Sequence, residues 1–297
     1  MNARRPRRQG PGRRASEWLL SSPSLLWLTV LVLVPTAIVF LIALRPPDVD
    51  GGIGAGWSAQ TLRSLARASY ARIAWRTVYL SFLTTVFCML LAVPCGYLIG
   101  RADRRWRQTL LLLVVIPFWT SFLIRIFAWK VLLHPDGAIK AALVWLGLVP
   151  PAAGLLYNAG AVLLVMVYTS LPFAILPVYA AAEKFDYTLI EAARDLGASP
   201  LGAFARVFVP GVRRGLLAAT LLVFIPSLGS YIIPDLVGSP SSEMLGNVIA
   251  QRVFVERNLP HASALAAVLT AAVLVPMLAV LLLRRNGGAS ARTRGAS

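Results

Sequence analysis

Long apolar runs separated by clusters of arginine dominate this sequence. A helix needs about 20 mainly apolar residues to cross the hydrocarbon core of a membrane, which is roughly 30 Å thick. The sequence holds six runs of that kind, and 58% of its 297 residues are hydrophobic while 14% are charged. A soluble domain of this length is far less apolar. We therefore predict an all-α integral membrane protein with six transmembrane helices, at about residues 24–44, 77–100, 109–133, 158–182, 215–236 and 262–283.

The positions of Lys and Arg predict how these spans are oriented. Excess positive charge in short flanks and loops stays on the cytoplasmic side of a membrane. Most of the 29 basic residues lie before the first span, between the second and third, between the fourth and fifth, and after the sixth. We therefore expect both termini in the cytoplasm. The net charge of +17 is spread over these flanks, which favours anchoring beside anionic lipid and argues against nucleic acid as a partner.

The two ends of the chain are predicted to be disordered tails. Residues 1–22 are rich in Arg, Gly and Pro, and residues 286–297 are rich in Gly, Ala and Ser, so neither end can build a core. Residues 23–285 then form the membrane domain. A secretory signal is the alternative for the first span, but the apolar core from Leu25 to Leu44 is longer than the apolar region of a signal peptide.

The sequence lacks the patterns that are typical of an enzyme. Its three lysines, Lys130, Lys140 and Lys184, do not follow a glycine, so the Gly-Lys-Ser/Thr of a nucleotide-binding P-loop is absent. The two cysteines, Cys88 and Cys95, lie roughly 10 Å apart along one helix and cannot bond to each other. An intramembrane enzyme would need paired ionisable residues deep in the spans, which hold almost none. We expect no catalytic site, cofactor or metal in this chain.

Several prolines lie within or at the ends of the expected spans. Proline has no backbone N–H and clashes with the preceding helical turn, and the neighbouring helices of a membrane protein tolerate the resulting kinks. Kinks are expected at Pro94, Pro117, Pro172, Pro177, Pro226, Pro234 and Pro276.

The loop at residues 183–214 carries the most specific local pattern. Asp186 is expected to cap a helix from Tyr187 to Leu196, and Gly197 to end that helix in the left-handed conformation. Ser199 and Pro200 are then expected to start a second helix. At 100° per residue, the first helix has an apolar face of Leu189, Ala192, Ala193 and Leu196, and a polar face of Tyr187, Glu191, Arg194 and Asp195.

This loop resembles the cytoplasmic loop of binding-protein-dependent ABC importer permeases. The similarity lies in the spacing of Glu191-Ala192-Ala193, Gly197 and Pro210, although Val207 and Val209 stand where Ile and Leu are more usual. It implies the type I ABC importer permease fold, with a coupling loop that docks on a separate ATPase subunit. ATP is then bound by that partner and not by this chain. The coupling residues so implied are Glu191, Ala192, Ala193, Asp195, Gly197 and Pro210.

Further motifs are similar to the spermidine/putrescine branch of these importers. The similarity implies an inner-membrane subunit that pairs with a second permease of a different chain, two ATPase subunits and a periplasmic or lipoprotein solute-binding protein. Importers of ferric ion, thiamine and 2-aminoethylphosphonate share this architecture, so these cargoes stay open, as does a stand-alone secondary transporter. The motifs are Leu171-Pro172-Phe173, Phe224-Ile225-Pro226, Ile233-Pro234-Asp235-Leu236 and Gly246-Asn247-x-Ile249.

A polyamine path needs carboxylates and aromatic faces to hold ammonium groups. Asp235, at the outer end of the fifth span, is the carboxylate nearest to the membrane, and Asp136 and Glu243 lie in outer loops. Ser227 and Tyr231 can line the path with it, or they can form hydrogen bonds between helices.

Two residues bear on the charge of the cargo. Ser230 stands where many relatives have an acidic residue, which weakens the polyamine prediction, although Ser230 remains a candidate for the path. Arg125, near the outer end of the third span, is either an anchor that extends to the membrane interface or a group that binds an anionic cargo.

Overall fold

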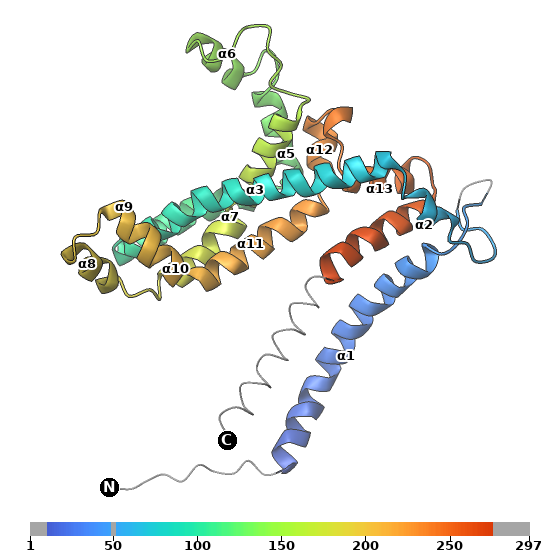
Figure 1. The fold of residues 1–297 in the computed structure, drawn as a ribbon, viewed down its shortest axis with the longest axis horizontal. Coiled ribbons are helices and arrows are strands. Elements are labelled where there is room, and N and C mark those ends of the chain that lie inside the picture. Colours follow the sequence, from blue (N-terminus) through green and yellow to red (C-terminus); the bar gives the residue numbers. More distant parts are fainter. Residues whose placement is uncertain (1–10, 49–51, 276–297) are drawn as a thin grey trace.

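The computed structural model describes residues 11–48 and 52–275, and its long elements are all helices. Three of them form the body of the molecule: α3 (Ala68–Arg101), α7 (Ala159–Ala182) and α11 (Arg213–Leu228) lie along one another (Figure 1). Small buried residues line the contact, among them Ala92, Ala174 and Ala219. The expected all-α membrane fold is confirmed.

Helix α1 (Pro11–Ile42) and the helix Leu259–Val275 run side by side and diverge from the body (Figure 1). Buried Ala43, Ala264 and Ala267 join them. The expected amino-terminal tail is wrong in its extent, because residues 11–22 are helical. Residues 1–10, the end of the expected sixth span after residue 275, and the tail at 286–297 lie outside the described residues.

The expected third span is not one straight helix. It consists of α4 (Arg104–Val115), the short 3-10 turn η1 (Ile116–Trp119) and α5 (Phe122–Leu132), with a bend of 90°. Pro117 is the second residue of η1 and lacks the N–H that would continue the ladder of hydrogen bonds.

The expected fifth span is also broken. Helix α11 ends at Leu228, residues 229–231 form a gap, and α12 (Ile232–Val237) follows. Next come the 3-10 turn η3 (Pro240–Ser242) and α13 (Leu245–Phe254). The proline kink expected at Pro226 precedes this break by less than one turn.

The number of candidate spans depends on how two bent pairs of helices are counted. One pair is Arg104–Trp119 with Phe122–Leu132, and the other is Pro200–Gly211 with Arg213–Leu228. In the described residues, three helices are long and apolar enough to cross a membrane, and up to five are if each bent pair counts as one span. The helix Leu259–Val275 is apolar but shorter. The number six therefore stays a prediction, because the described residues hold between three and five candidate spans and the sixth expected span extends beyond residue 275.

The remaining helices lie at the two ends of the body. Short α2 (Gln60–Ser64) precedes α3, and α6 (Ala138–Trp145) projects from the end of α5 (Figure 1). At the opposite end, α8 (Thr188–Asp195), α9 (Pro200–Ala203), the π turn η2 (Phe204–Phe208) and α10 (Val209–Gly211) lead to α11.

Candidate functional site

Local capping bonds form the helix–turn–helix at residues 183–214. The Asp186 carboxylate accepts hydrogen bonds from the backbone N–H (3.1 Å) and the hydroxyl (2.7 Å) of Thr188. Gly197 has a φ of +88°, the left-handed conformation that favours glycine. The Ser199 hydroxyl accepts the N–H of Gly202 at 3.1 Å and thereby caps α9. The predicted pair of short helices and its turn are confirmed.

A cluster of aromatic rings fixes this loop to the end of the body. The Phe208 ring is fully buried and lies 4.9 Å from the ring of Tyr97 on α3 and 5.3 Å from that of Phe185. Tyr187 also joins the cluster, and burial raises the pKa of its hydroxyl. Interlocked rings of this kind resist relative movement, so the loop and the helices of the body are expected to move together.

The face of α8 that packs against the body differs from the predicted apolar face. Ile190 is 5% exposed and touches the aromatic cluster, whereas Leu189 is 52% exposed and Leu196 is 90% exposed. The predicted apolar face was wrong because Tyr187 and Ile190 pack against aromatic rings from other segments. These contacts determine which side of α8 is buried. Leu189, Ala192 and Leu196 therefore face outward.

The structure brings three of the six predicted coupling residues, Glu191, Asp195 and Gly197, into one exposed hollow. This hollow has a volume of about 440 Å³ and is lined by Glu191, Arg194, Asp195, Gly197, Ala198 and Pro200. Ala192 is exposed beside it and Ala193 is half-buried. Pro210 begins the turn into α11 and does not line the hollow.

An ion pair that the sequence did not reveal joins the loop to the broken third span. Arg107, in the first turn of α4, binds the carboxylate of Glu183 at 3.0 Å. Its other terminal nitrogen donates to the carbonyl oxygens of Gly100 (3.0 Å) and Ala102 (3.3 Å) at the end of α3. Glu183 is the residue that follows α7 and opens the loop. The two residues are far apart in sequence, so only the fold could pair them.

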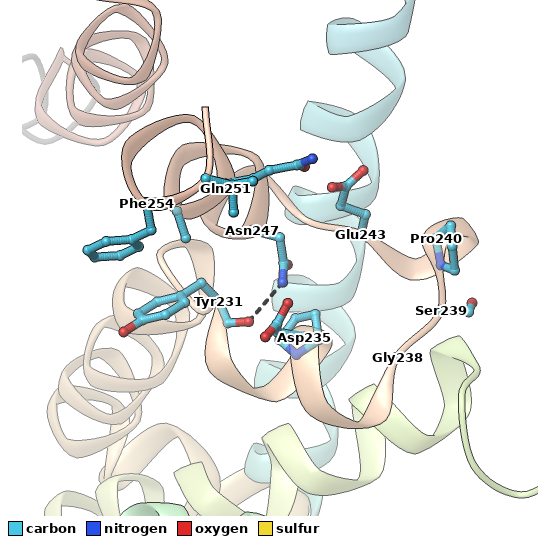
Figure 2. A pocket seen from close by; sticks show the side chains of 12 residues that line it. Tyr231, Asp235, Gly238, Ser239, Pro240, Glu243, Asn247, Gln251 and Phe254 are labelled. Atoms are coloured by element: carbon cyan, nitrogen blue, oxygen red, sulfur yellow. Dashed lines mark hydrogen bonds between the residues drawn. The ribbon is translucent and has the colours of Figure 1, made fainter. Parts of the chain in front are cut away.

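A pocket of about 550 Å³ lies among α12, η3 and α13, and we call it the acidic pocket (Figure 2). Two carboxylates line it, those of Asp235 and Glu243. Two aromatic rings, of Tyr231 and Phe254, line it with the amide of Gln251. The sequence had placed Glu243 in a separate loop, and the turn at η3 brings it to the pocket that holds Asp235.

Asn247 holds the break in the fifth span in place. Its side-chain amide donates to the carbonyl oxygen of Tyr231 at 2.8 Å (Figure 2) and accepts the N–H of Met244 at 3.2 Å. Gly246 lies against the carbonyl of Ser230, where any side chain would collide. The two motif residues Gly246 and Asn247 thus position the break.

A second cavity, of about 610 Å³, also borders this break, and we call it the arginine pocket. Arg125, Ser227, Ser230 and Tyr231 line it together with hydroxyl groups of α7. Tyr231 lines both pockets. The Ser227 hydroxyl is buried and donates to the carbonyl of Val223 at 2.7 Å, within its own helix.

The guanidinium of Arg125 folds back onto the break between α4 and α5. One terminal nitrogen donates to the carbonyl oxygens of Thr120 (2.8 Å) and Pro117 (3.3 Å). The charged group also lies 4.5 Å above the centre of the Phe118 ring. Carbonyl dipoles and a ring face thus stabilise this cation within the protein.

The predicted path residues therefore fall into two groups that share Tyr231. Asp235 lies in the acidic pocket, and Arg125, Ser227 and Ser230 lie in the arginine pocket. Asp136 lines neither of them and lies beside His134 in the turn after α5.

The sequence matches the family described as binding-protein-dependent transport system inner membrane component over residues 92–287. The chain belongs to this family. Family membership and the long apolar helices make it a multi-pass inner membrane permease subunit of an ABC importer.

Two curated relatives cover most of this permease. The spermidine/putrescine transport system permease protein PotB of Haemophilus influenzae is 35% identical over 260 residues, which are 88% of this chain and 90% of the relative. The Escherichia coli protein of the same name is 31% identical over 82% of this chain and 89% of its own length.

Solved structures share the fold of this permease. A bacterial ABC transporter involved in the import of the acidic polysaccharide alginate superimposes with a TM-score of 0.65 at 18% identity, over 91% of this chain and 96% of that one. The same kind of transporter in complex with an alginate-bound periplasmic protein gives a TM-score of 0.67 at 16% identity, over 90% and 93% of the two chains.

Proposed function

We propose that this permease subunit carries a polyamine, such as spermidine or putrescine, into the cell. The observation that carries the proposal is the acidic pocket, where Asp235 and Glu243 face a cavity with Tyr231 and Phe254. The two relatives named as spermidine/putrescine permeases support it.

The chemistry of this pocket suits a chain with an ammonium group at each end. An ammonium forms strong charge-assisted hydrogen bonds with a carboxylate, and aromatic faces attract cations and pack against methylene groups. The Gln251 side chain adds an amide oxygen. The pocket thus offers the groups that a polyamine needs and few that an anion would bind.

We also propose how the subunit is arranged and driven. Six membrane spans, with both termini in the cytoplasm, place the loop at residues 183–214 inside and the acidic pocket outside. Partner ATPase subunits bind ATP and receive the exposed face of α8, where Leu189 and Leu196 lie beside Glu191. A second permease of a different chain completes the path, a solute-binding protein delivers the cargo, and the arginine flanks rest on anionic lipid.

A second candidate cargo is 2-aminoethylphosphonate, because Arg125 lines the arginine pocket and Ser230 replaces an expected acidic residue. A phosphonate would bind a guanidinium well. The acidic pocket is the reason to prefer a polyamine.

The test is the ATPase activity of the reconstituted importer with its binding protein, assayed with spermidine, putrescine, ferric ion, thiamine and 2-aminoethylphosphonate. We expect a polyamine to stimulate hydrolysis, and the double variant Asp235→Asn/Glu243→Gln to raise the KM for uptake at least tenfold. Asp136→Asn, which removes a carboxylate outside the pocket, is the matched control. Stimulation by 2-aminoethylphosphonate alone would refute the polyamine assignment.

A further inference from the structure

The two pockets that meet at Tyr231 carry opposite charge. Asp235 and Glu243 line the acidic pocket, whereas Arg125 is the charged residue of the arginine pocket, whose lining contains no carboxylate. A cation that passes from the first pocket to the second therefore leaves two negative groups and approaches a positive one. This step is electrostatically uphill, because the cation leaves opposite charges and approaches a like charge.

The position of the Arg125 charge is fixed. Its guanidinium is bound to the carbonyl oxygens of Pro117 and Thr120 and lies over the Phe118 ring, all within the break of the third span. These partners are neutral, so they stabilise the group without cancelling its net charge. Moving the charge out of the pocket would break both hydrogen bonds and the ring contact, so a change in the shape of the break would act directly on its position.

A chain of contacts leads from the coupling loop to this break. Glu183 at the start of the loop is paired with Arg107, which lies in the first turn of α4. The other end of α4 runs into η1 and the 90° bend that Arg125 braces. A displacement of the loop would therefore move α4, which is the helix that precedes the bend.

We propose that Arg125 is an electrostatic barrier in the translocation path, which holds a cationic cargo at the acidic pocket until the bend between α4 and α5 changes. The barrier rests on the proposed polyamine function. Fixed positive charges exclude cations from other membrane pores in this way. In this permease, the barrier prevents polyamine from leaking down its own gradient when the ATPases are idle.

The experiment measures leakage through the complete importer in proteoliposomes loaded with labelled spermidine, without ATP or binding protein. We expect Arg125→Gln to increase spermidine efflux roughly tenfold, which corresponds to about 1.4 kcal/mol. Arg125→Lys keeps the charge and should stay within about twofold of the wild type. Thr120→Val removes a hydroxyl that binds the Pro117 carbonyl in the same break and is the control for altered packing. Efflux of mannitol, a neutral solute, should not change in any variant.

Each other outcome overturns the barrier. Equal efflux from wild type and Arg125→Gln would show that the charge does not oppose the cation. Increased efflux from Arg125→Lys and Thr120→Val, or increased mannitol efflux, would assign Arg125 to the packing of the bend. The wild-type importer is first assayed for ATP-driven spermidine uptake. Failure of that assay refutes the polyamine function and with it the barrier, whereas normal uptake without a leak in Arg125→Gln refutes the barrier alone.

Discussion

Gly197→Val tests whether the turn between α8 and α9 must keep its conformation for the ATPase to dock. Gly197 has a φ of +88°, and no heavy atom lies within 4 Å of the place where a Cβ would stand. A new Cβ would therefore meet no atom of the permease beyond the two adjoining residues. The cost that the backbone imposes is that of holding an L residue in the left-handed conformation.

That cost is about 1–2 kcal/mol for an ordinary L residue, and Val is among the residues least suited to this region. A difference of this size changes the ratio of two states by roughly 5- to 30-fold. The aromatic cluster around Phe208 anchors the loop independently of the turn, so we expect the protein to fold. The fraction of loops in the docking conformation, and hence the affinity for the ATPase, should fall by that factor.

The matched control is Gly197→Asn, because Asn also adds a side chain but tolerates the left-handed conformation. Both variants are compared with wild type for the Kd between the reconstituted permease pair and the ATPase subunit. We expect a weakened Kd for Val and a nearly normal Kd for Asn. Equal affinities in all three proteins would refute the reasoning, and equal losses in both variants would mean that the ATPase surface rejects any side chain there.

Three further predictions concern single contacts. Glu191→Lys should abolish ATP-driven uptake but leave the protein in the membrane, since it reverses the charge of the exposed hollow; normal uptake would argue against docking at α8. Gly100→Ala should lower the Tm in detergent, because the new Cβ would collide with the Tyr187 hydroxyl, at a cost of about 1–3 kcal/mol; adding Tyr187→Phe should restore much of the Tm. Asn247→Ala should weaken polyamine uptake, since the Tyr231 carbonyl loses its 2.8 Å hydrogen bond; an unchanged KM would remove Asn247 from the site.

The sequence by itself determined those features that depend on neighbours along the chain. The left-handed Gly197 and the Ser199-Pro200 start occurred as predicted, and Asp186 binds the N–H of Thr188 at the start of α8, although Tyr187 is the N-cap residue. Each of these features involves residues close together in the chain. The apolar runs likewise determined the membrane class, since their length and composition alone decide whether a helix suits a bilayer. The spacing around Glu191 was enough to indicate the family to which the chain belongs.

Only the tertiary structure decided how these pieces face one another. Prolines were equally visible in all the spans, yet Pro94 and Pro172 lie inside the uninterrupted helices α3 and α7, while Pro117 opens a 90° bend. Neighbouring helices tolerate the first two prolines within continuous helices, whereas beside Pro117 the carbonyl oxygens of Pro117 and Thr120 bind Arg125. Similarly, packing of Ile190 against the aromatic rings determines which face of α8 is buried. The turn at η3 places Glu243 in the pocket that Asp235 lines. These contacts join segments that are distant in the sequence, so a local sequence pattern cannot predict them.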